Sequence, residues 1–243
     1  MRIIKLDAID STNSYLRRLS MEETLEDYTV VMTKYQTQGK GQMGTIWHSE
    51  KSKNLMFSVF KDTSNLHIEY PFFISMATSL ALLKTLRKFS TPKLSIKWPN
   101  DILSEDKKIC GILIENVIKQ NTLSNTIIGI GLNVNQTEFE NLLKASSLKL
   151  TTGKVFHLDE VLQAILKNLK HYFKMLKNNE FELLKEEYEA ALFRKDKPST
   201  FKDAQGRVFT GFIKNVSLSG NLQVLLEDNI IKEFELKEIM LLY

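Results

Sequence analysis

Most of the chain alternates between stretches patterned as strands and stretches patterned as helices. Alternating or clustered apolar residues predict strands over 2–9, 28–34, 54–60, 94–96, 109–117 and 125–135. Apolar residues at helical spacing predict helices around Leu16 and over 70–89, 139–143, 158–176 and 181–192. This interleaving predicts a globular domain that contains both strands and helices.

The pattern changes after about residue 193. Residues 195–198 read Lys-Asp-Lys-Pro, which is typical of a linker. Short strand patterns separated by turn residues follow, over 200–202, 207–215, 221–226 and 230–234. A segment this small is weakly stable alone, so we expect a small β-barrel that leans on the larger domain. The predicted domains are therefore 1–193 and 194–243.

The predicted strand at 125–135 has two different faces. Its isoleucine, leucine and valine side chains alternate with Gly129, Gly131 and Asn133. The apolar face belongs to the core. Because glycine weakens a strand, two glycines on the other face predict that another group comes close to the backbone there, within reach of Asn133.

A glycine-rich loop lies between two predicted strands at residues 36–47. It holds Gly39, Gly41 and Gly44 together with Lys40. The glycine spacing satisfies G-x-G-x-x-G, but a dinucleotide fingerprint needs a helix at its last glycine, whereas strand-like residues follow here. We interpret the loop as an anion-binding loop, since glycines let successive N–H groups point at one ligand. A flexible surface loop is the alternative.

Three further polar segments stand at the ends of predicted elements. Residues 10–13, Asp-Ser-Thr-Asn, precede a helix, where they either cap it or bind a polar ligand group. Residues 97–101, Lys-Trp-Pro-Asn-Asp, carry more functional groups than a plain turn needs. Lys107 and Lys108 open the next strand; one reading brings an ammonium to the glycine floor and the other leaves both in solvent.

Composition excludes several classes of protein. The chain has 243 residues and a formal net charge of +4, which suits an anionic substrate but is small for a nucleic-acid-binding protein. Its one cysteine, Cys110, sits in an apolar run and is interpreted as packing. No stretch has the pattern of a signal peptide or a membrane span, so we expect a cytoplasmic protein without a membrane partner.

Together, the segments at 10–13, 36–47, 97–101, 107–113 and 129–133 resemble the biotin protein ligases. These enzymes use ATP to attach biotin to one lysine of a carrier domain. The resemblance implies an α+β fold with a mixed β-sheet flanked by helices and a C-terminal SH3-like β-barrel. It implies activation of biotin as biotinyl-5′-AMP, with ATP, Mg²⁺ and biotin required and no redox cofactor. The partner would be the biotin carboxyl carrier domain of a carboxylase.

The same resemblance implies roles for individual residues. Lys108 would lie between the biotin carboxylate and the α-phosphate, and Lys40 would be the phosphate-binding cation of the loop. Biotin would be bound by Ser11, Thr12, Gln36, Gly39, Gly111 and Gly129. ATP and the adenylate would be bound by Gly41, Gln42, Gly44, Trp47, Lys97, Asn100, Asp101, Gly131 and Asn133. Asp101 would also hold Mg²⁺.

Two departures from the family pattern change the expectations. Many members carry several arginines in the loop, whereas this chain has Lys40, Gln42 and Thr45 there, so we expect weaker retention of the intermediate unless Lys97 or Lys53 compensates. Some members begin with a helix-turn-helix domain. Because the catalytic pattern starts here by residue 10, we expect no such domain and no specific DNA binding.

Two other functions remain open from the sequence. A lipoate or octanoate ligase has a related fold and the same adenylate chemistry. The C-terminal segment could alternatively be a nucleic-acid-binding module, given Lys202, Arg207 and Lys214. The acidic residues of that segment argue against this second reading, because a surface that follows phosphates would be more uniformly basic.

Overall fold

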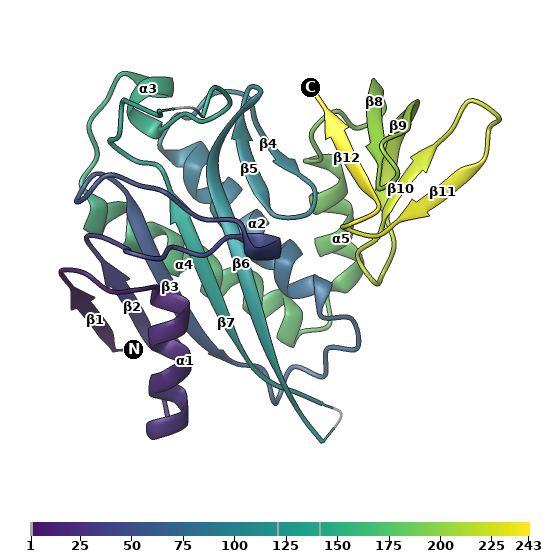
Figure 1. The fold of residues 1–243 in the computed structure, drawn as a ribbon. Coiled ribbons are helices and arrows are strands. Elements are labelled where there is room, and N and C mark those ends of the chain that lie inside the picture. The colour runs from purple at the N-terminus through teal and green to yellow at the C-terminus, as the bar shows by residue number, and fades with distance from the viewer. Residues whose placement is uncertain (1, 121, 141) are drawn as a thin grey trace.

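A large mixed β-sheet forms the centre of the protein, as the computed structural model of residues 2–120, 122–140 and 142–243 shows (Figure 1). Its strand order among these residues is β1-β2-β3-β7-β6-β5-β4. The strands are β1 (Ile3–Leu6), β2 (Val30–Thr33), β3 (Leu55–Asp62), β4 (Leu94–Lys97), β5 (Asp101–Ser104), β6 (Lys107–Lys119) and β7 (Thr122–Leu132). β1 and β2 run parallel, and the other neighbours run antiparallel.

Helices cover one face of this sheet and build the main core. They are α2 (Phe72–Lys88), α4 (Leu158–Lys177) and α5 (Phe181–Ala190) (Figure 1). The apolar stripe of α4 is buried from Val161 to Leu176, and acidic residues in its first turn with lysines in its last complement the helix dipole. The alternation of β7 places Ile128 and Ile130 in this core, as predicted.

The opposite face of the sheet is covered only in part, by α1 (Thr12–Glu22). Val30 packs in the main core, whereas its neighbour Val31 packs with Leu16 in a second apolar cluster, which shows that α1 lies on the other face. The remainder of this face, towards β5 and β4, carries the polar and glycine residues described below. The sheet is thus a core wall on one side and a site floor on the other.

The C-terminal part of the chain forms a second, smaller antiparallel sheet beside α5 (Figure 1). Its order among the described residues is β11-β10-β9-β8-β12. The strands are β8 (Pro198–Asp203), β9 (Val208–Val216), β10 (Leu222–Leu225), β11 (Ile231–Phe234) and β12 (Ile239–Leu242). Phe201 and Val224 belong to the same apolar cluster as the main core, so the small sheet does lean on the larger part.

Two polar contacts fasten the small sheet to the rest of the protein. The Trp98 indole Nε1 donates to the Gly220 carbonyl at 2.8 Å, and Glu189 Oε1 of α5 accepts from the buried Val216 N–H at 3.0 Å. Gly220 has a φ of +96°, and a Cβ there would overlap the Phe72 ring. A glycine is therefore required at that turn for both its conformation and its space.

Some predicted elements differ from the structure at their ends or in kind. β1 ends at Leu6 rather than residue 9, and β7 ends before Asn133. The helix expected over 139–143 includes residue 141, which lies outside the described residues, and the described residues of that range are not helical. Short elements were missed altogether, namely β5, β12 and α3 (Leu148–Thr152). Four or five residues are too few for a periodic pattern to emerge.

Candidate functional site

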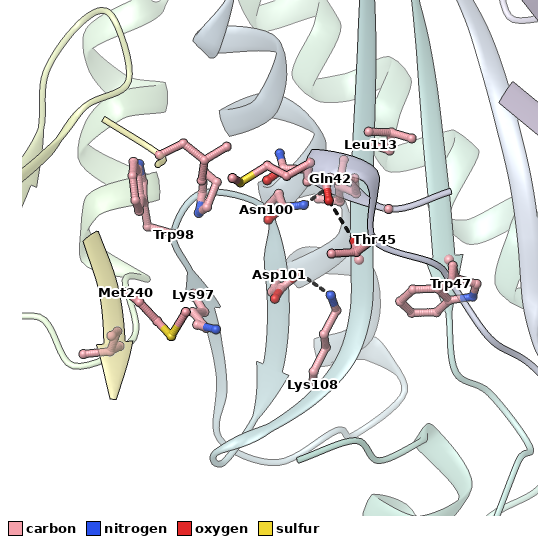
Figure 2. A pocket seen from close by; sticks show the side chains of 18 of the residues that line it. Gln42, Thr45, Trp47, Lys97, Trp98, Asn100, Asp101, Lys108, Leu113 and Met240 are labelled. Carbon is pink, nitrogen blue, oxygen red and sulfur yellow. Dashed lines mark hydrogen bonds and ion pairs between the residues drawn. The ribbon is translucent and has the colours of Figure 1, made fainter. Parts of the chain in front are cut away.

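A cavity of about 770 Å³ lies between the uncovered part of the sheet, the glycine-rich loop and the small sheet. Figure 2 shows Lys108 and Asp101 in its middle, with Trp47 on one side and Trp98 and Met240 on the other. A cleft of this size between two structural units is the usual form of a small-molecule site. The small sheet closes one side of it, which the sequence did not predict.

The register of the sheet explains why distant residues meet on the cavity floor. Gly131 of β7 pairs with Gly111 of β6, Gly111 pairs with Asp101 of β5, and Asp101 pairs with Lys97 of β4. Directly paired residues point to the same face of a sheet. Two glycines, a carboxylate and an ammonium therefore form one row across four strands, and the glycines leave the space that the Trp47 ring occupies.

The glycines of β6 and β7 are required by side chains that lie on them. A Cβ at Gly131 would come within 2.5 Å of the Trp47 ring, and one at Gly111 within 3.0 Å of it. A Cβ at Gly129 would overlap the Asn13 amide. The prediction that another group approaches this backbone is confirmed, and the groups are Trp47 and Asn13.

Lys108 and Asp101 form an ion pair at the centre of the cavity. Lys108 Nζ lies 2.7 Å from Asp101 Oδ1 and 5.5 Å from the centre of the Trp47 ring (Figure 2). Asp101 is the more buried partner, with its side chain 15% exposed against 35% for Lys108. Lys108 lines the cavity, whereas its neighbour Lys107 is exposed. Of the two predicted alternatives, an ammonium at the glycine floor therefore holds for Lys108, and exposure to solvent holds for Lys107.

Further cations gather on the far side of Asp101. Lys97 Nζ and Lys144 Nζ lie 4.9 Å and 3.7 Å from the centre of the Tyr243 ring. Burial lowers the pKa of Lys97 below the ordinary lysine value; Lys108 and Lys144 add to this and Asp101 opposes it. Asp101 and Asp106 are the carboxylates that act on Tyr243. The three ammonium groups outnumber these two carboxylates, so this end of the site is positive, which favours an anionic ligand.

The glycine-rich loop folds back on itself beside the cavity. The Trp47 N–H donates to the Gly39 carbonyl at 2.9 Å and the Gly41 N–H donates to the Thr45 carbonyl at 2.7 Å. A short 3₁₀ turn, η1 (Gln42–Gly44), forms its tip, and β3 rather than a helix follows. Rejection of the dinucleotide fingerprint is therefore confirmed.

A polar corner stands at the start of α1. Gln36 Oε1 accepts from the Thr12 N–H at 2.8 Å, so the amide of Gln36 satisfies a free helix N-terminal donor. Ser11 occupies the N-cap position but makes no side-chain capping bond. Of the two readings for residues 10–13, capping by the Ser11 hydroxyl is therefore wrong, and that hydroxyl stays available at the cavity wall.

The structure brings most of the predicted site residues to this one cavity. Those that line it are Ser11, Thr12, Gln36, Lys40, Gly41, Gln42, Trp47, Lys97, Asn100, Asp101, Lys108, Gly111, Gly129 and Gly131. Those that do not are Gly39, Gly44 and Asn133. Asn133 is buried and donates to the Ser146 carbonyl at 2.9 Å. Asn100 lines the cavity, but its amide donates to the Ile112 carbonyl at 2.6 Å and so holds β5 against β6.

Sequence reasoning missed several residues that the fold brings to the site. Asn13 belongs to the polar segment at 10–13, but the sequence pattern predicts no individual role for it. Lys144 and Tyr243 come from segments without a motif, and Lys237 and Met240 line the cavity from the small sheet. Nothing in a linear pattern places these residues near the lysines at 97 and 108, because each depends on tertiary packing.

Cys110 and the candidate metal ligand have clear environments. Cys110 is fully buried, which confirms that it packs in the core, and burial raises the pKa of its thiol. Within the described parts of the chain, no group of three His, Cys, Asp or Glu side chains could hold a metal ion. Asp101 alone fits Mg²⁺ only where ligand phosphates supply most of the other oxygens.

None of the helices among the described residues is long and apolar enough to cross a membrane.

Known proteins are similar to this chain over the part that contains the site. The biotin/lipoate A/B protein ligase family matches residues 6–133, which include all five segments named in the sequence analysis. The bifunctional ligase/repressor BirA of Bacillus spizizenii is 32% identical over 168 residues, 68% of this chain and 51% of that protein. The biotin--[acetyl-CoA-carboxylase] ligase of Mycobacterium tuberculosis is 30% identical over 57% of this chain and 51% of that protein. The chain thus spans about half the length of the curated relatives it matches.

A solved structure resembles the whole fold. The biotin protein ligase from Aquifex aeolicus, in complex with biotin and ATP, superposes with a TM-score of 0.82 at 28% identity. The match covers 99% of this chain and 98% of that one, and so includes the small sheet as well as the large. The chain belongs to the biotin/lipoate A/B protein ligase family.

Proposed function

We propose that the protein is an ATP-dependent biotin ligase. It activates biotin as biotinyl-5′-AMP and transfers the biotinyl group to a lysine of a biotin carboxyl carrier protein. The observation that carries the proposal is one cavity that joins a polar corner at α1, a glycine floor and the Lys108–Asp101 pair. The Aquifex aeolicus relative, titled as a complex with biotin and ATP, supports the same pair of substrates.

The two ends of the cavity suit the two substrates. The corner with Ser11, Thr12 and Gln36 receives the ureido ring, and the chain of biotin lies beside Gly111 and Gly129, next to the side chains that cover these glycines. The positive end around Lys97 receives the phosphates. Trp47 stacks on the adenine, and its buried Nε1, which has no partner among the described side chains and backbone, is free to bond a ligand.

Each step then has a chemical basis in these residues. A carboxylate oxygen of biotin attacks the α-phosphorus, a P–O bond forms, and pyrophosphate leaves with the electrons of the broken P–O bond. Lys108 leaves Asp101 and neutralises the charge that builds on the α-phosphate. The carrier lysine, as a free amine, next attacks the acyl carbon and AMP leaves. Mg²⁺, held in part by Asp101, would neutralise the phosphates of ATP.

The loop over residues 36–47 acts as a cover for the intermediate. A mixed anhydride hydrolyses in water, so excluding solvent is necessary until the carrier arrives. Its glycines make closure depend on ligand, because ordering them costs entropy. Lys40 supplies a single cation in place of several arginines, and backbone N–H groups supply the remaining phosphate contacts.

The finer division of the chain follows the same proposal. We assign residues 1–193 to the catalytic domain and 194–243 to an SH3-like barrel, of which the five-stranded sheet is the framework. The carrier approaches beside the small sheet, where Lys237 and Met240 line the cavity. Specific binding to DNA is not part of the proposed function, and a footprint on a biotin-synthesis promoter would contradict this.

One assay tests the function and its nearest rival. The purified chain is incubated with Mg-ATP and either biotin or lipoate, and pyrophosphate release is followed before a carrier domain is added. We expect release with biotin and a biotinylated carrier lysine by mass spectrometry. Release with lipoate alone would show a lipoate ligase of the same family, and release with neither would reject both functions.

A further inference from the structure

Buried polar side chains form a connected chain beneath the corner of the cavity at α1. Ser58 Oγ lies 2.5 Å from Asn13 Oδ1 and 2.7 Å from Thr12 Oγ1. On its other side, Asn13 Nδ2 lies 2.8 Å from Glu115 Oε2 and 3.4 Å from the Leu113 carbonyl. Thr12, Asn13 and Ser58 are each at most 4% exposed. Because these three side chains are buried against one another, their own donors and acceptors fix the direction of each bond.

The direction of the first bond follows from Asn13. Both partners of its Nδ2 are oxygens that only accept, a carboxylate and a carbonyl, so the NH₂ group must face them. Asn13 Oδ1 then faces Ser58 and can only accept. Ser58 has a single hydroxyl proton, which therefore goes to Asn13.

The direction of the second bond follows from the first. With its proton used, Ser58 Oγ can only accept from Thr12, so the Thr12 hydroxyl donates its own proton to Ser58 at 2.7 Å. The alternative acceptor, Gln36 Oε1, is farther away at 3.2 Å and already accepts from the Thr12 N–H at 2.8 Å. Facing the cavity, the Thr12 oxygen has lone pairs and no proton to offer.

We infer that Asn13 and Ser58 are positioning residues that hold the Thr12 hydroxyl as a hydrogen-bond acceptor and thereby determine substrate specificity. The corner then selects an acid whose ring brings an N–H donor, such as the cyclic urea of biotin. The dithiolane ring of lipoate brings none and would bury the Thr12 oxygen without a partner, which is the arrangement that polar sites reject most strongly. This inference rests on the proposed function and names the groups that separate its substrate from that of the lipoate ligases.

Removal of one hydroxyl group tests this chain of hydrogen bonds. Ser58→Ala frees the Thr12 proton to turn towards the cavity or Gln36, while Ser79→Ala removes another fully buried serine hydroxyl, one on α2 that does not line the cavity. Binding of biotin alone and of ATP alone is measured by calorimetry on the full chain. We expect the biotin Kd to rise about tenfold in Ser58→Ala, as for one lost hydrogen bond, with the ATP Kd and the Ser79→Ala variant within twofold of wild type.

Two further substitutions keep the test independent of folding losses at Ser58. Thr12→Val keeps the shape and removes the acceptor, and Thr12→Ser keeps the acceptor. We expect Thr12→Val to weaken biotin binding at least as much as Ser58→Ala, and Thr12→Ser to bind biotin within threefold of wild type.

A double substitution tests the other end of the hydrogen-bond chain. Asn13→Asp places a second carboxylate opposite Glu115, so we expect it to weaken biotin binding. Adding Glu115→Gln supplies an N–H donor to the introduced carboxylate and restores the direction of the hydrogen bonds, so we expect the biotin affinity to recover.

The selectivity readout separates this inference from a purely structural role. Pyrophosphate release with biotin and with lipoate gives a ratio of kcat/KM values, which we expect to fall in Ser58→Ala because only the biotin value decreases. Equal losses for both acids, or unchanged biotin affinity in both Ser58→Ala and Thr12→Val, would overturn the inference. If wild type neither binds nor activates biotin, the proposed function fails instead, whatever the variants do.

Discussion

The ammonium of Lys108 and the carboxylate of Asp101 lie 2.7 Å apart in the same cavity. In the absence of substrates, each therefore neutralises the other. In the proposed function, the anionic substrates separate this pair, and Lys108 is then available to the negative charge of the α-phosphate.

Lys108→Ala is expected to abolish adenylate formation. The variant removes the cation that we propose neutralises charge on the α-phosphate, and loss of one such group typically slows the step by about a hundredfold or more. Single-turnover pyrophosphate release with biotin and Mg-ATP measures it. Lys107→Ala is the matched control, since Lys107 is exposed one residue earlier. Comparable adenylate synthesis by the Lys108 variant would contradict the assigned role.

Lys40→Ala is expected to affect retention of the adenylate more than its synthesis. Lys40 is exposed, and a single exposed cation contributes up to about 1 kcal/mol, or roughly a fivefold change. Release of labelled adenylate from the purified complex should accelerate by this factor while the single-turnover rate of synthesis changes less than twofold. Lys51→Ala, which also removes an exposed lysine, serves as the control. A larger effect on synthesis than on release would assign Lys40 to the chemistry instead.

Gly131→Ala is expected to displace Trp47 and weaken nucleotide binding. The added methyl group would come within 2.5 Å of the indole ring, which must then leave the sheet floor. In a Trp98→Phe background Trp47 is the remaining tryptophan, so its fluorescence reports its environment. We expect a shifted emission maximum and a raised Kd for ATP relative to Trp98→Phe alone. Unchanged emission and affinity would show that the floor accommodates a methyl group.

Lys97 is expected to strengthen ATP binding and to lower the free energy of unfolding of the protein. Because burial lowers its pKa from 10.5, the charged form is disfavoured in the folded state at neutral pH. This destabilisation is complete below the folded pKa and disappears as pH rises from that value to 10.5. Lys97→Met should therefore raise Tm at pH 7, and the gain should shrink as pH rises towards 10.5.

The same titration predicts the pH dependence of nucleotide binding. As Lys97 loses its proton, the positive end of the cavity weakens, so the Kd for ATP should rise in alkaline solution below pH 10.5. Lys97→Met should have a higher Kd and a flatter alkaline profile. Lys88→Met removes an exposed lysine of the last turn of α2 as a control. An equally steep profile in both variants would mean that another group titrates.

Glu189→Ala is expected to loosen the attachment of the small sheet. Glu189 Oε1 accepts from the buried Val216 N–H and from Lys185 Nζ at 2.7 Å. Leaving that N–H unpaired costs about 1–3 kcal/mol. Thermal unfolding should show a Tm lower by several degrees than in Glu186→Ala, which removes an exposed carboxylate from the same helix. Equal melting temperatures would show that water or a rearranged side chain satisfies the N–H.

The sequence was most informative where residue type and local period act together. Alternation over β7 identified its core face and its glycine face, and the long apolar stripes identified α2 and α4. Fourteen of the predicted site residues line one cavity because their motifs sit at strand ends and in loops that the fold brings to the same face.

The pairing between strands could not be predicted from the pattern of apolar and polar residues. Nothing in the sequence sets Gly131 opposite Gly111, or Gly111 opposite Asp101, because register depends on the neighbouring strands. Asn13 received no role for a similar reason. Its function depends on Ser58 and Glu115, which are 45 and 102 residues away in the chain.

The turn between β4 and β5 has attachments on both sides. Asn100 binds it to β6 through the Ile112 carbonyl, and Trp98 binds it to the small sheet through the Gly220 carbonyl. Lys97 and Asp101 flank this turn, so a displacement of the small sheet would be transmitted to both charges. Suppose that the proposed carrier binds the small sheet and thereby changes the affinity of the site for the adenylate. Thermodynamic linkage then requires that the carrier bind the adenylate-bound and the empty protein with affinities that differ by the same factor.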